Sequence, residues 1–329
     1  MTRRILRRLA VSAVTLAGIT VLTFLLFHLA PGDPLAPLEG GSRGAVSTDA
    51  LARMRAEAGF DRPLWQQYGL WLSRLARGDL GRSLVDGEPV RGKIAARLPA
   101  TLVLAGAATL LAWGLALPLA IRSALRPGGA LDRGGSLFFY AIYSVPVFWT
   151  ALVLQMVFAV YLRWLPLHGV LSDEAAAMAP AGRLADGALH LVLPAACLAY
   201  GQLAFLMRFA RANLLEARGR EFFAAALARG LTERQAMLRH ALPNALLPLI
   251  TIAGFTVPAL AAGSVIVERI FSWPGVGRLL VDSIGSRDRP TLMGLTLLGA
   301  LLTQAGMLAA DILYAAADPR LRRLGEERP

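Results

Sequence analysis

The sequence has little of what a soluble enzyme or a metal protein needs. Its one cysteine, Cys197, can form no internal disulfide and no thiolate metal cluster. Its one lysine, Lys93, is followed by isoleucine, so the Gly-Lys-Ser/Thr of a phosphate-binding loop is absent. The four histidines are scattered and form no His-Glu-x-x-His pair. We therefore expect no metal centre, and we expect that the chain does not hydrolyse ATP itself.

Charge is also scarce, at 17% of residues, whereas 56% are hydrophobic and the mean hydropathy is +0.53. Six stretches contain no charged residue, and each is long enough to cross the hydrocarbon layer as a helix, which takes roughly 20 apolar residues. They are Leu9–Ala30, Pro99–Ile121, Ser136–Leu162, Gly187–Met207, Ala241–Val267 and Thr291–Ala310. This pattern predicts an all-α membrane protein with six transmembrane helices and excludes a soluble enzyme.

The positive charge, a net +12, flanks these apolar stretches. With the N-terminus inside, the inner segments carry 18 arginines and the short outer loops carry six, with the long segment 31–98 left out of the count. The positive-inside rule then places both termini in the cytoplasm. Contact with anionic lipid headgroups explains this charge better than binding to nucleic acid does. We interpret the first apolar stretch as a retained span, because secretory signals have shorter apolar cores of about 7–15 residues.

The segment 31–98 is predicted to be a small helical extracytoplasmic insertion. It opens on a turn at Pro31-Gly-Asp-Pro34 and closes on another at Gly78–Ser83. Between the turns, helical patterning covers Thr48–Gly59 and Leu64–Arg77. The predicted division of the chain is a cytoplasmic N-terminus with the first span at 1–30, the insertion at 31–98, a five-span core at 99–316 containing a cytoplasmic loop at 211–245, and a cytoplasmic tail at 317–329.

The cytoplasmic loop carries the most specific local pattern. Glu221–Arg229 is rich in helix-forming residues, and Gly230 follows where a left-handed residue would end the helix. Thr232 and Gln235 have the spacing of a capping box that starts a second helix. The first helix exposes two adjacent aromatic side chains, Phe222–Phe223, to water. Two alternatives explain them: an amphipathic helix lying on the membrane surface, or a helix docked in a groove of another protein.

Glu221–Thr251 resembles the EAA loop of ATP-binding-cassette importer permeases, in particular the dipeptide/oligopeptide/nickel permease family. Further segments fall in the order of that family, and the resemblance extends from Arg4 to Arg323. They are Pro31-Gly-Asp-Pro34, Leu64-Trp-Gln-Gln-Tyr68, Gly78-Asp-Leu-Gly81, Tyr143-Ser-Val-Pro-Val-Phe-Trp149, His240-Ala-Leu-Pro-Asn244 and Ile270-Phe-Ser-Trp-Pro-Gly275. A single short motif would be weak evidence for this family, but an ordered set of motifs across the chain is specific to it.

The resemblance implies the type I importer permease fold and a peptide importer in the bacterial cytoplasmic (inner) membrane. It implies a second, homologous permease subunit, two cytosolic ATPase subunits that bind ATP and magnesium, and an extracytoplasmic solute-binding protein. In such importers the EAA loop forms the coupling helix, which docks on an ATPase. The docking residues implied here are Glu221, Phe222, Phe223, Ala225, Ala226, Arg229 and Gly230. Where the family often has Arg-Thr-Ala-Arg, this chain has Ala224-Ala-Ala-Leu227, so we expect a more apolar contact.

Other features remain open at the level of sequence. Tyr143, Gln155 and Gln202 are candidates to line the translocation path, with core packing as the alternative for each. The competing function is an autonomous secondary carrier or channel, but no carboxylate lies near the middle of a predicted span to bind a driving ion. Dipeptides, longer peptides, nickel chelates and glutathione-like peptides all remain candidate solutes.

Overall fold

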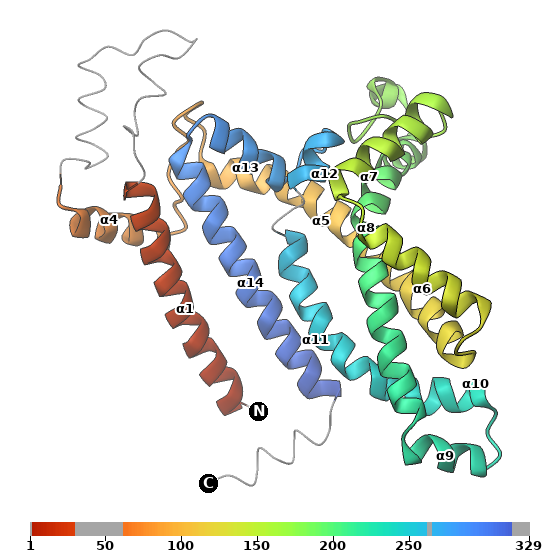
Figure 1. Cartoon of the computed structure of the whole chain (residues 1–329). Coiled ribbons are helices and arrows are strands. Elements are labelled where there is room, and N and C mark those ends of the chain that lie inside the picture. The colour runs from red at the N-terminus through yellow and green to blue at the C-terminus, as the bar shows by residue number, and fades with distance from the viewer. Residues whose placement is uncertain (1, 30–61, 262–264, 318–329) are drawn as a thin grey trace.

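The computed structural model describes residues 2–29, 62–261 and 265–317, and the backbone in these ranges is helical apart from short connections (Figure 1). The helices are α1 (Thr2–Leu29), α4 (Leu64–Ala76), α5 (Val90–Leu125), α6 (Ala130–Tyr143), α7 (Val147–Leu154), α8 (Pro180–Arg218), α9 (Glu221–Ala228), α10 (Glu233–Ala236), α11 (Leu242–Ala261), α12 (Val265–Ile270), α13 (Val276–Gly285) and α14 (Arg289–Ala317). Two π-helical segments, Gln155–Tyr161 and Met237–Ala241, and one 3₁₀ segment, Asp173–Ala177, complete the described elements.

Within the described ranges, four helices are long and apolar enough to cross a membrane: α1, α5, α8 and α14. The bent pair formed by α6 and the segment Val147–Tyr161 makes a fifth if it is counted as one span. The predicted fifth span contains α11, a 20-residue helix that packs against α14 and is not among these candidates. The all-helical membrane architecture is confirmed, whereas the number six stays a prediction.

The expectation of one continuous helix over Ser136–Leu162 is wrong. α6 and the following helical segment meet at a bend of 101°. The break covers Ser144 to Pro146, where proline lacks a donor N–H and restricts the residue before it. An uncharged stretch of sequence therefore contains two helices with different directions.

α5 runs without interruption from Val90 to Leu125, across the predicted limit between residues 98 and 99, and the division of the chain into an insertion and a core stays a prediction. The uncharged stretch begins at Pro99, but the helix begins earlier, with Arg91 and Lys93 in its first turns. The predicted helix Leu64–Arg77 is confirmed as α4, which lies across one end of α1 in Figure 1. The predicted helix at 48–59 lies outside the described residues.

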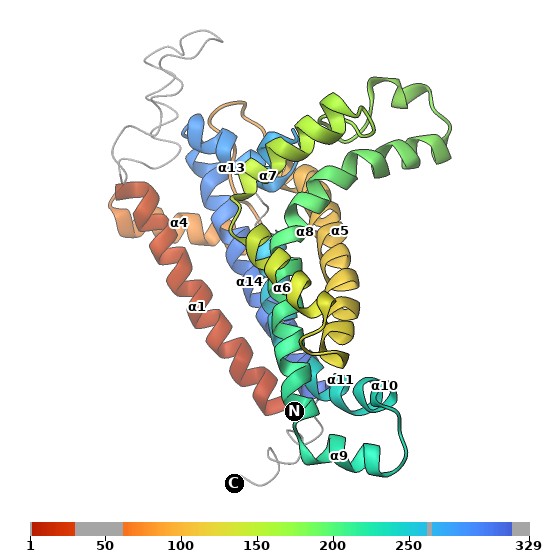
Figure 2. The ribbon, with the colours of Figure 1, turned by 45° about the vertical axis from the view of Figure 1, so that its right-hand side comes forward.

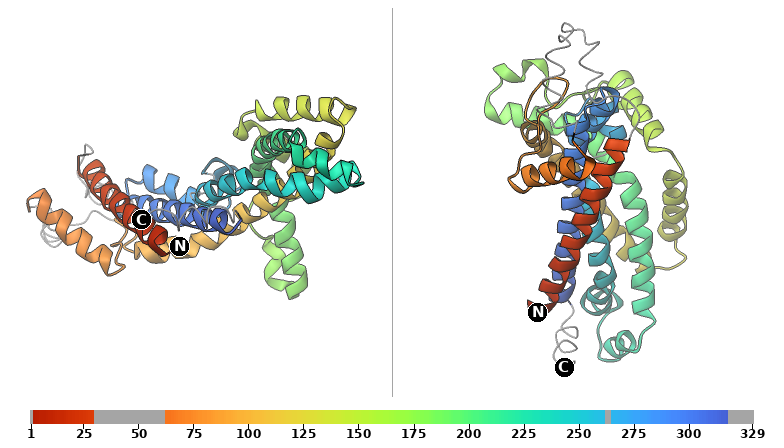
Figure 3. Two further views of the ribbon diagram at one scale, coloured as in Figure 1. Left: turned by 90° about the horizontal axis from the view of Figure 1, so that it is seen from below. Right: turned by 90° about the vertical axis from the view of Figure 1, so that its left-hand side faces the viewer.

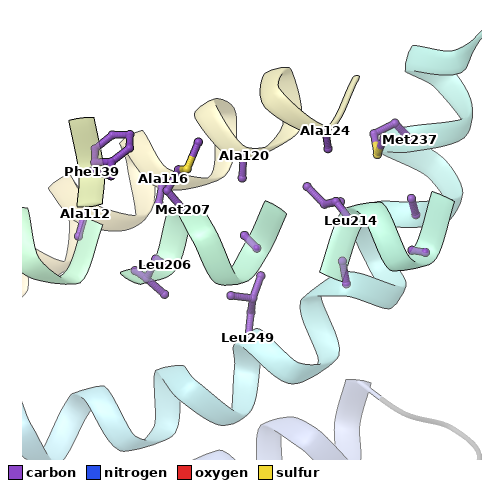
Figure 4. Close-up of a cluster of buried hydrophobic side chains, with 14 of the residues drawn as sticks. Ala112, Ala116, Ala120, Ala124, Phe139, Leu206, Met207, Leu214, Met237 and Leu249 are labelled. Atoms are coloured by element: carbon purple, nitrogen blue, oxygen red, sulfur yellow. The ribbon is translucent and has the colours of Figure 1, made fainter. Parts of the chain in front are cut away.

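Small side chains allow α5 and α8 to pack closely along their length. Alanines recur at every fourth position of α5 and are fully buried: Ala108, Ala112, Ala116, Ala120 and Ala124. Figure 4 shows part of this ridge facing Met207 and Leu214 of α8. Small residues let two backbones approach closely, which gives a tight interface inside a membrane, where apolar burial offers no net gain over lipid.

The two ends of the molecule differ in structure. In Figure 1, α9 and α10 lie at one end, called here the α9 end, and α12 and α13 lie at the opposite, α13 end. α1 begins and α14 finishes on the α9 side. Figure 2 shows the first part of α8 running across the α13 end before the helix turns toward α9.

α1 packs beside α14, as the right-hand view of Figure 3 shows. Ser12 Oγ donates to Gln304 Oε1 over 3.0 Å, and Arg8 Nε lies 3.0 Å from Asp311 Oδ2. These two contacts give Ser12, Gln304, Arg8 and Asp311 partners within the chain.

At the α13 end, the segment between α12 and α13 closes on a buried carboxyl group. Glu268 is fully buried; it accepts from Thr101 Oγ1 over 2.9 Å and from the N–H of Arg278 over 2.9 Å. A Cβ atom on Gly275 would lie 2.3 Å from this carboxyl group, so only glycine fits. The Ile270–Gly275 motif therefore packs this end against α5.

Candidate functional site

The loop between α8 and α11 folds into two short helices separated by a glycine turn. α9 ends at Ala228, and Gly230 has a φ of +87°, with its N–H donating to the Leu227 carbonyl over 2.9 Å. This left-handed conformation suits glycine, because a Cβ atom would meet the backbone. The predicted glycine stop is confirmed, and the predicted helix Glu221–Arg229 exceeds α9 by one residue.

Thr232 and Gln235 form the predicted capping box at the start of α10. The Gln235 N–H donates to Thr232 Oγ1 over 3.3 Å, and the Thr232 N–H donates to Gln235 Oε1 over 3.0 Å. Both bonds satisfy backbone N–H groups that have no partner in the first turn of a helix. α10 then continues through the π-helical segment Met237–Ala241 into α11, so the second helix leads directly back to the helical body.

One face of α9 belongs to the core of the chain. Phe223 is 3% exposed and Ala226 is fully buried, in the same cluster as Leu214 of α8 and Met237. Phe223 therefore needs no partner protein to leave water. The expectation that both phenylalanines await a partner is wrong for Phe223, and Ala226 likewise offers no side chain to a docking subunit.

The physical reason is the helical period. Neighbouring residues of a helix point about 100° apart, so Phe222 and Phe223 face different directions, whereas Phe223 and Ala226 are three residues apart and share a face. Phe222 is 37% exposed. The predicted docking residues that lie exposed are Glu221, Phe222, Ala225, Arg229 and Gly230. We call these five, together with the exposed Ala224, Leu227 and Ala228, the outer face of α9.

A single arginine joins this loop to the end of α5. Arg218 Nη1 donates to the carbonyl of Ala124 over 2.9 Å, and its Nη2 donates to Glu233 Oε1 over 2.9 Å. The guanidinium thus satisfies a free carbonyl at the C-terminus of α5 and holds the first turn of α10 at the same time. Sequence reasoning missed this role, because it counted Arg218 only as one of many positive charges at the inner surface.

A second arginine joins three helices just before the loop. Arg211 of α8 pairs with the buried Asp132 of α6, with Nη2 donating to Oδ2 over 2.7 Å. Asp132 also accepts from Ser123 Oγ at the end of α5 and from the N–H of Gly128 over 2.8 Å. Arg211 therefore ties α8 to α6 and to the end of α5, and Arg218 joins the same end of α5 to the α9–α10 loop.

The three predicted path residues do not form one site. Gln155 Nε2 donates to the carbonyls of Leu167, over 2.8 Å, and Ile270, over 3.3 Å, so its amide already ties two segments of this chain. Gln202 Oε1 is buried and has no hydrogen-bond partner among the described residues. Tyr143 is 53% exposed at the end of α6, just before the break.

The α13 end contains a cavity of about 540 Å³ between α13, the first turns of α5 and the loop that precedes α5. Its charged lining residues are Asp86, Glu88, Lys93, Arg97, Asp282 and Asp288. Lys93 Nζ donates to Asp86 Oδ2 over 2.6 Å and lies 3.8 Å from Asp288 Oδ2. Within the described ranges, no group of three or more His, Cys, Asp or Glu residues is arranged to hold a metal ion.

The Asp86 carboxyl in this cavity has a pKa below its ordinary value of 3.8. Partial burial raises the pKa, but hydrogen bonds from Lys93, from the Glu88 N–H and from Ser83 outweigh burial and stabilise the charged form. The Asp86 carboxylate is therefore charged at neutral pH and forms an ion pair with Lys93 in the wall of the cavity.

Comparison with known proteins covers both halves of the chain. The family described as "Binding-protein-dependent transport system inner membrane component" matches residues 116–323, and the N-terminal component of such systems matches residues 1–105. The chain belongs to this permease family. The permease is thus a multi-pass inner-membrane component of an ATP-binding-cassette transporter and not itself an enzyme.

Curated relatives resemble the permease over its whole length. The oligopeptide transport system permease protein AppB of Bacillus subtilis (strain 168) is 39% identical over 98% of this chain and 99% of the relative. The dipeptide transport system permease protein DppB of Escherichia coli (strain K12) is 36% identical over the same shares. The di/tripeptide transport system permease protein DppB of Pseudomonas aeruginosa (strain UCBPP-PA14) is 38% identical over 97% of this chain and 98% of the relative.

Proposed function

We propose that this permease forms, with a second homologous permease, the membrane path of an ATP-driven importer of di- or oligopeptides. The α9 helix carries the proposal: it exposes apolar side chains between Glu221 and Arg229, and the end of α8 that precedes it is tied to α5 and α6 through Arg218 and Arg211. Such a helix suits the transfer of motion from a cytosolic ATPase to the path. The solute class rests on the names of the full-length relatives. Family membership does not favour the autonomous carrier or channel.

The outer face of α9 is the docking surface in this proposal. Phe222 and Leu227, each 37% exposed, supply its apolar area, and Ala225 lies between them in sequence. Glu221 and Arg229 flank these residues at the two ends of the helix. An apolar contact rimmed by charge is the usual anatomy of a protein interface, and aromatic anchors dominate the energy of such contacts.

Docking of the ATPase on α9 determines which end of the permease faces the cytoplasm in this proposal. Two ATPase subunits, which bind ATP and magnesium, contact the permease pair on the cytoplasmic side, so the α9 end is cytoplasmic, together with both termini. A solute-binding protein approaches the α13 end, where the cavity beside Lys93 presents charges of both signs. The complete permease has six spans, including one formed by α11, and Tyr143 and Gln202 face the path.

The test is purification of the tagged chain in mild detergent from its native membrane, with mass spectrometry of its stoichiometric partners. A second permease and one or two ATPases with phosphate-binding loops are expected. Reconstitution of that complex with its binding protein should then give uptake of a labelled dipeptide that requires ATP. Uptake by this chain alone, without ATP, would instead establish the carrier.

A further inference from the structure

Arg208 is the first charged residue after the uncharged stretch Gly187–Met207 of α8. It lies in α8, one turn before Arg211, and the spanning candidate Pro180–Arg218 contains both. Charged side chains within spans are costly, and they usually face a water-filled cavity or the interior of a bundle. Arg211 has the buried carboxylate of Asp132 as its partner, which explains its presence. Arg208 has no carboxylate partner among the residues that the structure describes.

The side chain of Arg208 points away from the α9 end. Its Nε donates to the Ala204 carbonyl over 3.2 Å, four residues earlier in α8, so the chain extends back along the helix toward the α13 end. Helical side chains tilt toward the N-terminus of their own helix, and this bond holds the Arg208 guanidinium on the α13 side of its own Cα.

Two tyrosines of α6 hold the guanidinium in that position. Its central carbon lies 4.5 Å from the ring centre of Tyr140 and 5.1 Å from that of Tyr143. The rings are three residues apart, share one face of α6, and are 56% and 53% exposed. A cation stacked on aromatic faces is stabilised while its N–H edge remains free to donate. The surface thus offers a fixed cation, several unused donors and two phenol groups.

The break after α6 is an independent sign that this surface borders the path. The helix ends at Tyr143, and non-helical backbone follows until α7 begins at Val147. Backbone of this kind is tolerated at membrane depth only where it is covered by protein or lines an aqueous cavity. In transporters, interrupted helices commonly surround the substrate.

We propose that Arg208, Tyr140 and Tyr143 form a binding site for the terminal carboxylate of a peptide in transit. A carboxylate matches the paired N–H donors of a guanidinium, and a tyrosine hydroxyl can donate a further bond. This inference rests on the function proposed above, since it names the group of the solute that the path recognises. A cation that stacks on two tyrosine rings and has no carboxylate partner among the described residues would favour peptides with a free C-terminus over uncharged solutes.

The experiment compares a dipeptide with its C-terminal amide in the reconstituted complex at saturating binding protein. Selectivity is the uptake rate of the free acid divided by that of the amide. The same binding protein serves every variant, so its own preference for the acid or the amide is a constant factor. Dividing the selectivity of each variant by that of the unaltered complex removes this factor. Arg208→Gln should lower selectivity about tenfold, the order expected for one charge-assisted hydrogen-bond pair. Arg208→Lys should retain part of it, since the charge remains and the paired geometry is lost.

Arg122→Gln, another arginine on the neighbouring helix α5, is the matched control and should leave selectivity unchanged. Equal loss of both peptides in Arg208→Gln, or selectivity equal to that of the unaltered complex, would overturn the proposal. An effect that disappears in vesicles of neutral phosphatidylcholine would assign Arg208 to a lipid headgroup and also overturn it. If the unaltered complex imports neither peptide, the proposed function fails first, and that outcome is distinct from all of these.

Discussion

Replacing Phe222 and Phe223 of α9 separately tests which face of the helix stabilises the fold and which face binds the ATPase. Phe223 is 3% exposed in the cluster with Leu214 and Met237, so Phe223→Ala should cost about 3–5 kcal/mol of folding stability through lost burial and a cavity. Phe222 is 37% exposed, and its truncation leaves no cavity. Phe222→Ala should therefore cost less, about 1–2 kcal/mol for partial burial of one aromatic side chain.

For association with the ATPase, we expect the larger effect from Phe222→Ala and the smaller one from Phe223→Ala. An aromatic residue at the centre of an interface commonly contributes about 2 kcal/mol or more to binding, so Phe222→Ala should weaken the complex roughly thirtyfold or more. Phe223 is buried, so Phe223→Ala should weaken association with the ATPase only to the extent that it unfolds the α9–α10 loop. Leu227 is equally exposed but lies about 140° around the helix from Phe222, so Leu227→Ala shows how far the ATPase contact extends around α9.

Two assays read these effects independently. The melting temperature of the purified chain in detergent reports stability, and recovery of the ATPase subunits with the tagged permease reports association. The assignment of faces would be refuted by a Phe223→Ala variant that melts like the original protein but loses the ATPase. Full ATPase recovery with Phe222→Ala would restore the alternative in which α9 lies on the membrane surface.

The remaining predictions concern the turn, the anchor and the α13 end. Gly230→Pro should abolish peptide uptake with the chain still in the membrane, because proline cannot adopt a φ of +87°, whereas Gly230→Ala, at about 1–2 kcal/mol of strain, should retain uptake. Arg218→Gln should raise the ATP hydrolysed per peptide imported, since the bridge from Glu233 to α5 is lost; an unchanged ratio would show that the bridge transmits nothing. The lowered pKa of Asp86 contributes stability that is complete above its ordinary value of 3.8 and lost as pH falls through the folded-state pKa. Melting temperatures measured from neutral to acid pH should show this loss, and Lys93→Met should reduce it, because Lys93 donates to the carboxylate.

Local patterns in the sequence were enough for the features that depend on neighbouring residues. The left-handed Gly230 after the end of α9 and the capping box of Thr232 and Gln235 were both predicted, because a left-handed residue and a side-chain cap act within one helical turn. The same holds for α4, whose apolar period is visible in 13 residues. The membrane class follows from uncharged stretches that have no other stable environment.

Predictions failed where hydropathy alone defined an element. The stretch Ser136–Leu162 is uniformly uncharged, yet it bends sharply after Tyr143, since hydropathy does not record direction. α5 begins at Val90 and not at Pro99, because charged residues in its first turns do not prevent a helix. Hydropathy locates apolar segments, whereas backbone hydrogen bonding decides where helices start and stop.

The class of the protein, its permease family and the local shape of the loop were predictable from the residues alone, because composition, ordered motifs and helix capping act within short stretches of chain. That Phe223 is core while Phe222 is surface followed from the packing of distant segments, since it depends on where Leu214 and Met237 lie. The same packing also decided the roles of the arginines. Arg208 and Arg211 are alike in sequence, but one meets aromatic rings and the other meets a carboxylate, because α6 presents different residues at different depths.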